Sequence, residues 1–113
     1  MKPSKRLLVV LVLAAMTHAS YAIASRAKAV NVTNNTSYTM GEFYASASDS
    51  SSWNTNNNLL AGQTIAPGQT ITIIISDGLA TCHYDLMAVL YGSAQHAYQY
   101  RVNACRNGSW TLQ

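Results

Sequence analysis

The sequence predicts an all-β protein, a small antiparallel β-sandwich of immunoglobulin-like size with six or seven short strands and one disulfide. Stretches rich in Val, Ile, Thr and Tyr alternate with short clusters of Asn, Ser, Gly and Pro, which is typical of short strands joined by turns. No segment longer than one turn has helical periodicity. Two cysteines, Cys82 and Cys105, supply the pair for one bridge.

The first 24 residues have the organisation of a secretory signal peptide. Three basic residues within the first six positions precede an unbroken apolar run, residues 7–16, and small residues follow it. The run is too short for a membrane-spanning helix, which needs about 20 apolar residues. We expect cleavage after Ala24, with Ala22 as the second choice, although an uncleaved anchor helix is the alternative. Residues 25–113 are then one domain without a stable membrane span.

Loss of the signal peptide changes the charge of the protein. The whole chain has seven Lys and Arg residues against four Asp and Glu, and a pI near 9.0. Three of these basic residues belong to the signal, so residues 25–113 have equal numbers of acidic and basic side chains. A domain without net positive charge lacks the electrostatic attraction that nucleic-acid binding requires. We therefore expect no nucleic-acid partner.

Six strands follow from the alternation of apolar residues between turn-forming clusters. Within the second, the apolar phase shifts between Met40 and Phe43, which a β-bulge at Gly41 would explain. The expected strands are residues 28–33, 38–47, 69–76, 81–91, 96–104 and 109–112.

Two segments are expected to add to the core around these strands. Leu59 and Leu60 follow a polar loop and return the chain to the interior. In residues 69–76, the three isoleucines at odd positions share one face of the strand. Ile74 lies on the other face, which we expect to be partly buried too.

Cys82 and Cys105 are expected to form a disulfide because exported proteins fold in oxidising compartments. If residues 92–95 form a four-residue hairpin loop, the two cysteines lie directly opposite each other, within disulfide reach. A turn centred on residues 91–92 would instead place Cys82 opposite Arg101, and the bridge would need another geometry.

Several motifs spread along residues 25–113 form a recognisable series. They are Val32-x-Asn34 with Thr36, Phe43-Tyr44 with Ser46, Trp53, Leu59-Leu60, Pro67-Gly68-Gln69, and Cys82-His83-Tyr84-Asp85-Leu86 with Cys105. In these motifs the chain resembles a family of small exported bacterial proteins, often labelled Tat pathway signal protein. The resemblance implies a β-sandwich in the cell envelope and implies no activity. The chain departs from the family pattern at Asn54, where the family usually has Gly, and at Tyr91-Gly92, where the family usually has Asp-Gly. It also has no Arg-Arg pair before the apolar run.

The best candidate for a binding site is the polar loop of residues 48–58. It places Trp53 near Asp49, Asn54 and Asn56, a mixture of aromatic and amide groups that sugar-binding or peptide-binding surfaces often use. The alternative is that Trp53 folds back as a core anchor beside the two leucines that follow the loop.

A second group of candidates contains His83, Asp85 and His96. The first two lie two positions apart on an expected strand and therefore share a face, and His96 begins the next strand. Metal sites need three or four convergent ligands, and the sequence offers no further one. We expect Asp85 to accept hydrogen bonds from backbone groups or from Arg101, and we expect no metal and no cofactor.

The tyrosines could form an exposed stacking face, or they could be wall residues whose hydroxyl groups reach water; they are Tyr44, Tyr84, Tyr91, Tyr98 and Tyr100. No nucleophile motif is present and only four acidic residues are available, so an enzyme is not expected. The leading hypothesis is a non-enzymatic secreted or periplasmic domain that binds an envelope protein or glycan, as an inhibitor, immunity or adhesion-like module. The alternative is a small hydrolase or metal-dependent enzyme that uses His83, Asp85 and His96.

Overall fold

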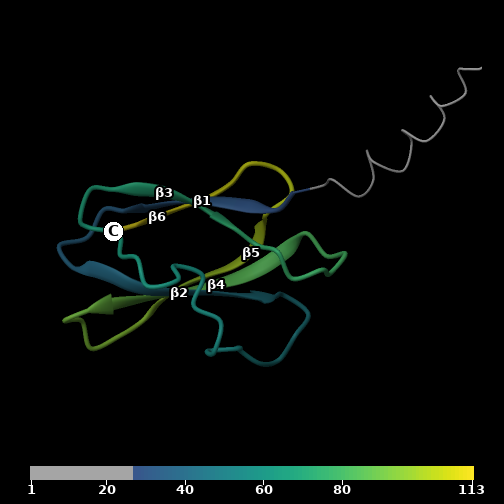
Figure 1. The fold of residues 1–113 in the computed structure, drawn as a ribbon, viewed down its shortest axis with the longest axis horizontal. Helices are drawn as coiled ribbons and strands as arrows, with labels where there is room; N and C mark the ends of the chain where they lie inside the picture. Colours follow the sequence, from purple (N-terminus) through teal and green to yellow (C-terminus); the bar gives the residue numbers. More distant parts are fainter. Residues whose placement is uncertain (1–26) are drawn as a thin grey trace, which may run out of the picture.

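The computed structural model describes residues 27–113, which form six strands in two three-stranded sheets packed face to face (Figure 1). One sheet has the order β3-β1-β6 and the other the order β2-β4-β5. The all-β architecture with one disulfide is thus confirmed. The expected signal peptide and its cleavage sites lie outside the described residues. The strands are β1 (Ala29–Asn34), β2 (Thr39–Ala47), β3 (Thr70–Ile74), β4 (His83–Tyr91), β5 (Ala97–Asn103) and β6 (Gly108–Leu112).

Three of the four strand pairs are antiparallel, as expected, but β1 and β6 run parallel. The difference arises after β5, where the chain crosses from one sheet to the other and enters β6 beside β1 instead of returning along β5. Asn107, with φ of 53°, turns the chain immediately before β6. Asparagine is one of the few residues besides glycine that adopts this left-handed conformation readily.

The hydrophobic core fills the space between the two sheets. Its largest fully buried side chains include Tyr84, Phe43 and Met40. Leu60 is buried and Leu59 packs against the core, which confirms the expected return of the chain after the polar loop.

The isoleucines of β3 and the residue after it divide between two environments. Ile73 and Ile75 are buried and Ile71 packs against the core, so the shared inward face is confirmed. Ile74 is 55% exposed, so the expected partial burial of the other face was wrong. Ile74 lies on the face of β3 that points away from the other sheet, and β3 is at the edge of its own sheet, so among residues 27–113 this side chain has little to pack against.

The expected bulge at Gly41 is present in β2. Met40 pairs with Leu90 of β4, but Glu42 pairs with Val89, so Gly41 is an extra residue without a partner. The ring of Tyr91 occupies the space above Gly41, and a Cβ atom at this position would lie 1.9 Å from Tyr91 Cζ. A glycine at the bulge therefore leaves room for the Tyr91 ring, which a larger residue would have to displace.

The register of β4 and β5 differs from both expected alternatives. His83 pairs with Asn103, so Cys82 lies opposite Ala104, whose amide donates a hydrogen bond of 2.8 Å to the Cys82 carbonyl oxygen. Cys105 is therefore one position beyond direct opposition. The disulfide forms nevertheless, with the two Cα atoms 5.3 Å apart.

A bulge in β5 accounts for this register. Two residues, Tyr100 and Arg101, stand opposite the single residue Asp85 of β4. Arg101 has φ of 56°, and its amide donates a 3.0 Å hydrogen bond to Asp85 Oδ1. Ser48 Oγ donates a second hydrogen bond of 2.8 Å to the same oxygen. The expectation that Asp85 accepts hydrogen bonds from the backbone is confirmed.

Asn34 at the end of β1 is fully buried and satisfies all of its hydrogen-bonding groups. Its Nδ2 donates to the carbonyl oxygens of Tyr38 and Ile65, at 2.8 and 2.9 Å. Its Oδ1 accepts from the amide and hydroxyl of Thr36, at 3.1 and 2.6 Å. One side chain thus fixes the turn before β2 and the segment that pairs with the start of β2.

Candidate binding site

The polar loop of residues 48–58 runs along the free edge of β2 and is fastened to it. Ser46 Oγ donates a 2.8 Å hydrogen bond to the Ser52 carbonyl oxygen. At the other end of the loop, the Phe43 amide donates to Asn58 Oδ1 at 3.0 Å, and the Leu59 amide donates to the Phe43 carbonyl oxygen at 2.8 Å. The loop therefore protects an edge strand and holds its side chains in fixed positions.

Trp53 is half-buried and lies outside the hydrophobic core. Its ring centroid is 6.0 Å from that of Tyr98 on β5, in a tilted arrangement, and Tyr98 stacks on Tyr100 with 6.0 Å between centroids. Trp53 is therefore not the core anchor that the alternative expected. Trp110 packs against the core instead, 6.1 Å from Phe43. We call Trp53, Tyr98 and Tyr100 the aromatic row.

The five tyrosines that could form a stacking face divide into two groups. Tyr44 and Tyr84 are buried, and are therefore wall residues. Tyr98 is 43% exposed and Tyr100 is 59% exposed, and both belong to the aromatic row. Tyr91 is also exposed but lies at the far end of β4, over the bulge in β2. The exposed stacking face thus consists of two tyrosines and the tryptophan of the loop.

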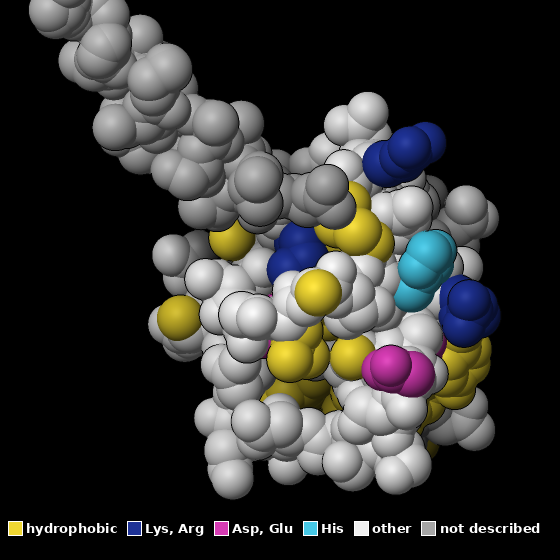
Figure 2. All heavy atoms as spheres, turned by 90° about the vertical axis from the view of Figure 1, so that its right-hand side faces the viewer, with side chains coloured by type: hydrophobic (Ala, Val, Ile, Leu, Met, Phe, Trp, Pro, Cys, Tyr) yellow, Lys and Arg dark blue, Asp and Glu magenta, His cyan; other side chains and the backbone are white. Residues whose placement is uncertain are grey.

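A hollow of about 420 Å³ lies beside Trp53, between the 48–58 loop and the segment of residues 77–79. Ala45 and Ala47 of β2 belong to its lining, and both belong to or pack on the core. Figure 2 faces the end of the sandwich where these loops lie, and shows hydrophobic side chains in a recess that white, uncharged atoms border below, with an acidic side chain at one edge and a basic side chain above. The loop contributes polar residues to the lining, namely Ser50, Ser52, Asn54 and Asn57.

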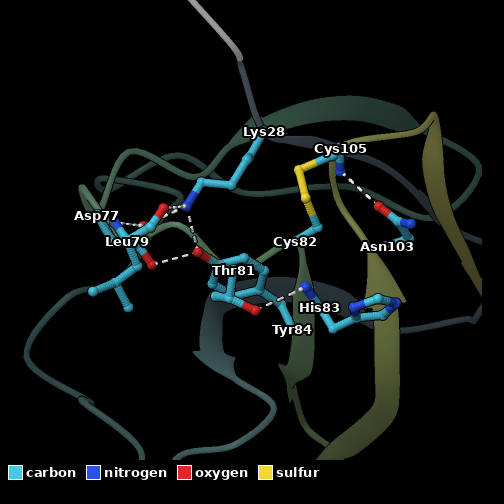
Figure 3. Close-up of a disulfide and its surroundings, with 9 residues drawn as sticks. All are labelled: Lys28, Asp77, Leu79, Thr81, Cys82, His83, Tyr84, Asn103 and Cys105. Carbon is cyan, nitrogen blue, oxygen red and sulfur yellow. Dashed lines mark hydrogen bonds and ion pairs between the residues drawn. A yellow bond between two sulfur atoms is a disulfide. The ribbon is translucent and has the colours of Figure 1, made fainter. Parts of the chain in front are cut away.

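The opposite wall of the hollow contains Asp77, whose carboxylate is paired with a buried lysine. Lys28 Nζ donates to Asp77 Oδ1 at 2.6 Å, to the Leu79 carbonyl oxygen at 2.9 Å and to the Tyr84 hydroxyl at 2.5 Å. The Tyr84 hydroxyl in turn donates to Asp77 Oδ2 at 2.6 Å. Figure 3 shows the lysine reaching from the start of β1 to these three groups. All three donors of the ammonium group are therefore used.

The pKa values in this cluster favour the ion pair. Burial alone would lower the pKa of Lys28, but its hydrogen bonds to Asp77 and Tyr84 outweigh burial and raise that pKa. Burial would likewise raise the pKa of Asp77, but the hydrogen bonds from Lys28 and Tyr84 lower it. The pKa of Tyr84 is raised, first by burial and then by its hydrogen bond to Asp77. At neutral pH the wall therefore holds a compensated pair of charges.

Sequence reasoning missed this cluster, although a signal was present. Lys28 has the same strand phase as Val30 and Val32, which are fully buried, so alternation points its side chain inward. A lysine on an inward face requires a partner. That partner, Asp77, is 49 positions away along the chain, where the Asp77-Gly78 pair indicates only a turn.

The structure does not bring His83, Asp85 and His96 together. His83 is exposed at the start of β4, while His96 precedes β5 at the other end of the same hairpin. The pair that contains His83 and the pair next to His96 are five residue steps apart along β4, or about 17 Å. In residues 27–113, no group of three or more His, Cys, Asp and Glu side chains could hold a metal ion.

The setting of the site follows from the disulfide. Disulfides form and persist mainly in oxidising extracytoplasmic compartments, so the Cys82–Cys105 bond indicates such an environment for this domain. Within the part of the chain that the structure describes, no helix has the length and hydrophobicity needed to cross a membrane. Comparisons with models of protein families, with curated proteins and with solved structures find no match to this chain.

Proposed function

We propose that this protein is a non-enzymatic binding module of the cell envelope, secreted or periplasmic, that contacts a macromolecular partner through the 48–58 loop and the aromatic row. The observation that carries the proposal is the position of Trp53, outside the core and between a hollow and two exposed tyrosines. Aromatic side chains held in this way are the usual anchors of binding surfaces. The partner is an envelope protein or a glycan.

The charge of the domain supports a contact made by aromatic and amide groups. Residues 25–113 contain four acidic and four basic side chains, so no net charge attracts a partner over a distance. Asp77 and Lys28 also neutralise each other. Binding should therefore change little between low and high salt, because screening acts mainly on exposed charges.

The test compares binding of the domain, residues 25–113, with that of a Trp53→Ala variant, using an envelope fraction from the producing organism. Loss of a Trp anchor should weaken binding by about thirtyfold, which corresponds to about 2 kcal/mol. The matched control is Ile74→Ala, which truncates an exposed apolar side chain on the other sheet. Both variants should keep the melting temperature of the parent. Normal binding by Trp53→Ala, or a loss accompanied by a much lower melting temperature, would contradict the proposal.

The proposed location has its own test. Intact-mass measurement of the exported protein should give a chain that begins at Ser25, or at Ile23 if cleavage follows Ala22. An exported species that still carries residues 7–16 would contradict cleavage of the signal peptide.

A further inference from the structure

We propose that the hollow beside Trp53 binds a sugar unit of an uncharged glycan. This inference rests on the proposed function, because it names the class of partner that the same loop contacts. It is carried by three features of the hollow. These are a fixed aromatic wall, side-chain amides with unused hydrogen-bonding groups among residues 27–113, and a carboxylate whose charge is already compensated.

The aromatic wall is suited to the apolar face of a sugar ring. A pyranose presents C–H groups on its faces and hydroxyl groups around its edge, so it packs on an aromatic ring while its hydroxyls find polar partners. Trp53 lines the hollow, and its contact with Tyr98 fixes the indole before any ligand arrives. Such preorganisation lowers the entropic cost of binding. Ala45 and Ala47 add small apolar surface to the lining of the same hollow.

The polar groups of the loop match the edge of the sugar. The side chain of Asn57 makes no hydrogen bond to any of residues 27–113, although it lines the hollow. Among residues 27–113, Asn54 uses only its Oδ1, which accepts a hydrogen bond of 3.1 Å from the Asn56 amide, and its NH₂ group is left for a ligand. An amide offers a donor and an acceptor side by side, which suits the neighbouring hydroxyl groups of a sugar.

Compensation of Asp77 excludes charged ligands. It is the one charged residue in the lining of this hollow as described, and both of its oxygens are occupied by Lys28 and Tyr84. An anion would be repelled by this carboxylate. A cation would have to compete for it with the buried Lys28 ammonium group, which has no other charge partner among residues 27–113. The volume of about 420 Å³ is at the lower end of the roughly 300–1,000 Å³ range of ligand sites. A concave, neutral and amide-lined site of this size favours a sugar over the flat surface of a protein.

The experiment treats the envelope fraction in two ways before measuring binding of the full domain. Digestion with protease should leave binding intact, whereas oxidation with periodate, which cleaves the vicinal diols of sugars, should abolish it. On the protease-treated fraction, Asn57→Ala should bind at least tenfold more weakly than the parent. Asn35→Ala is the matched control, because Asn35 is exposed and outside the lining of the hollow. All variants must have the same melting temperature as the parent.

The outcomes separate this inference from the proposal beneath it. Binding that protease removes and periodate spares would identify a protein partner, overturning the glycan inference while the proposed function stands. Binding to the protease-treated fraction that Asn57→Ala leaves unchanged would place the sugar elsewhere, which also overturns the inference. Failure to bind the untreated envelope fraction would refute the proposed function itself.

Discussion

Removal of Asp77 should destabilise the domain more than removal of its partner Lys28. The side chain of Lys28 is 9% exposed and that of Asp77 is 30% exposed. Asp77→Ala leaves a buried ammonium group whose partners within residues 27–113 are only the Leu79 carbonyl and the Tyr84 hydroxyl. Lys28→Met leaves a carboxylate that water can reach, and the methionine fills much of the volume of the lysine stem.

The magnitudes follow from the cost of an uncompensated buried charge. Breaking a buried pair by removal of one partner costs about 3–5 kcal/mol, which we expect for Asp77→Ala. We expect about 1–2 kcal/mol for Lys28→Met, which mainly removes hydrogen bonds to a group that stays hydrated. Against a total stability of about 5–15 kcal/mol, the first change is severe. The double variant should be more stable than Asp77→Ala alone, because it contains no buried cation.

Urea denaturation of the four proteins, followed by tryptophan fluorescence, measures this double-mutant cycle. Asp49→Ala is the control, because Asp49 is an exposed acidic residue and its removal should change stability by less than about 0.5 kcal/mol. The reasoning would be refuted if the two single changes were additive, or if Asp77→Ala were no more costly than Lys28→Met.

Three further predictions concern pH, the disulfide and two glycines. The pKa of Asp77 is lowered from 3.8, so its contribution to the free energy of unfolding is fully present above pH 3.8 and is lost as the pH falls through the pKa of the folded state. The pKa of Lys28 is raised from 10.5, so its contribution to the free energy of unfolding is fully present below pH 10.5 and is lost as the pH rises through the pKa of the folded state. Melting temperature against pH should show both limbs, and Asp77→Ala should flatten the acid one. Replacement of both cysteines by Ala should lower the free energy of unfolding by about 2–5 kcal/mol in urea titrations, and free thiols in the native oxidised protein would contradict the bridge. Gly108→Ala should cost about 1–3 kcal/mol, because its Cβ would lie 2.8 Å from a backbone oxygen. Gly41→Ala should cost less than that, since the ring it meets is half-exposed and can turn into solvent; equal costs in thermal melts would refute this contrast.

The strands and the bulge at Gly41 could be predicted because their signals are local. Apolar alternation sets which residues face the core, and a phase shift beside a glycine marks an extra residue. The pairing of β4 with β5 could not be predicted in the same way. Its register depends on Arg101, a non-glycine residue in a left-handed conformation that is held by the carboxylate of Asp85, 16 positions away. The local conformational preference of arginine does not predict a left-handed conformation.

The candidate site was predictable in composition but not in arrangement. The loop of residues 48–58 combines one tryptophan with several amides, and this mixture is visible in the sequence. Whether Trp53 enters the core depends on what else fills it, and Phe43, with Trp110 packed against it, already supplies aromatic bulk there. The second wall of the hollow, around Asp77, comes from a segment far along the chain. Only the packing of the two sheets brings these parts together.

Stability and binding meet in the segment of residues 77–79. Asp77 accepts a hydrogen bond from Lys28, which directly precedes β1, and Asp77 also forms a wall of the hollow beside Trp53. Lys28→Met therefore removes the charge that keeps the hollow neutral as well as the hydrogen bonds that position its wall. A neutral sugar does not depend on that charge, so a loss of binding in this variant would report displacement of the wall. Asn57 makes no side-chain hydrogen bond to Lys28 or Asp77, so Asn57→Ala should change binding without changing stability. For that reason Asn57→Ala is the variant that tests the glycan inference.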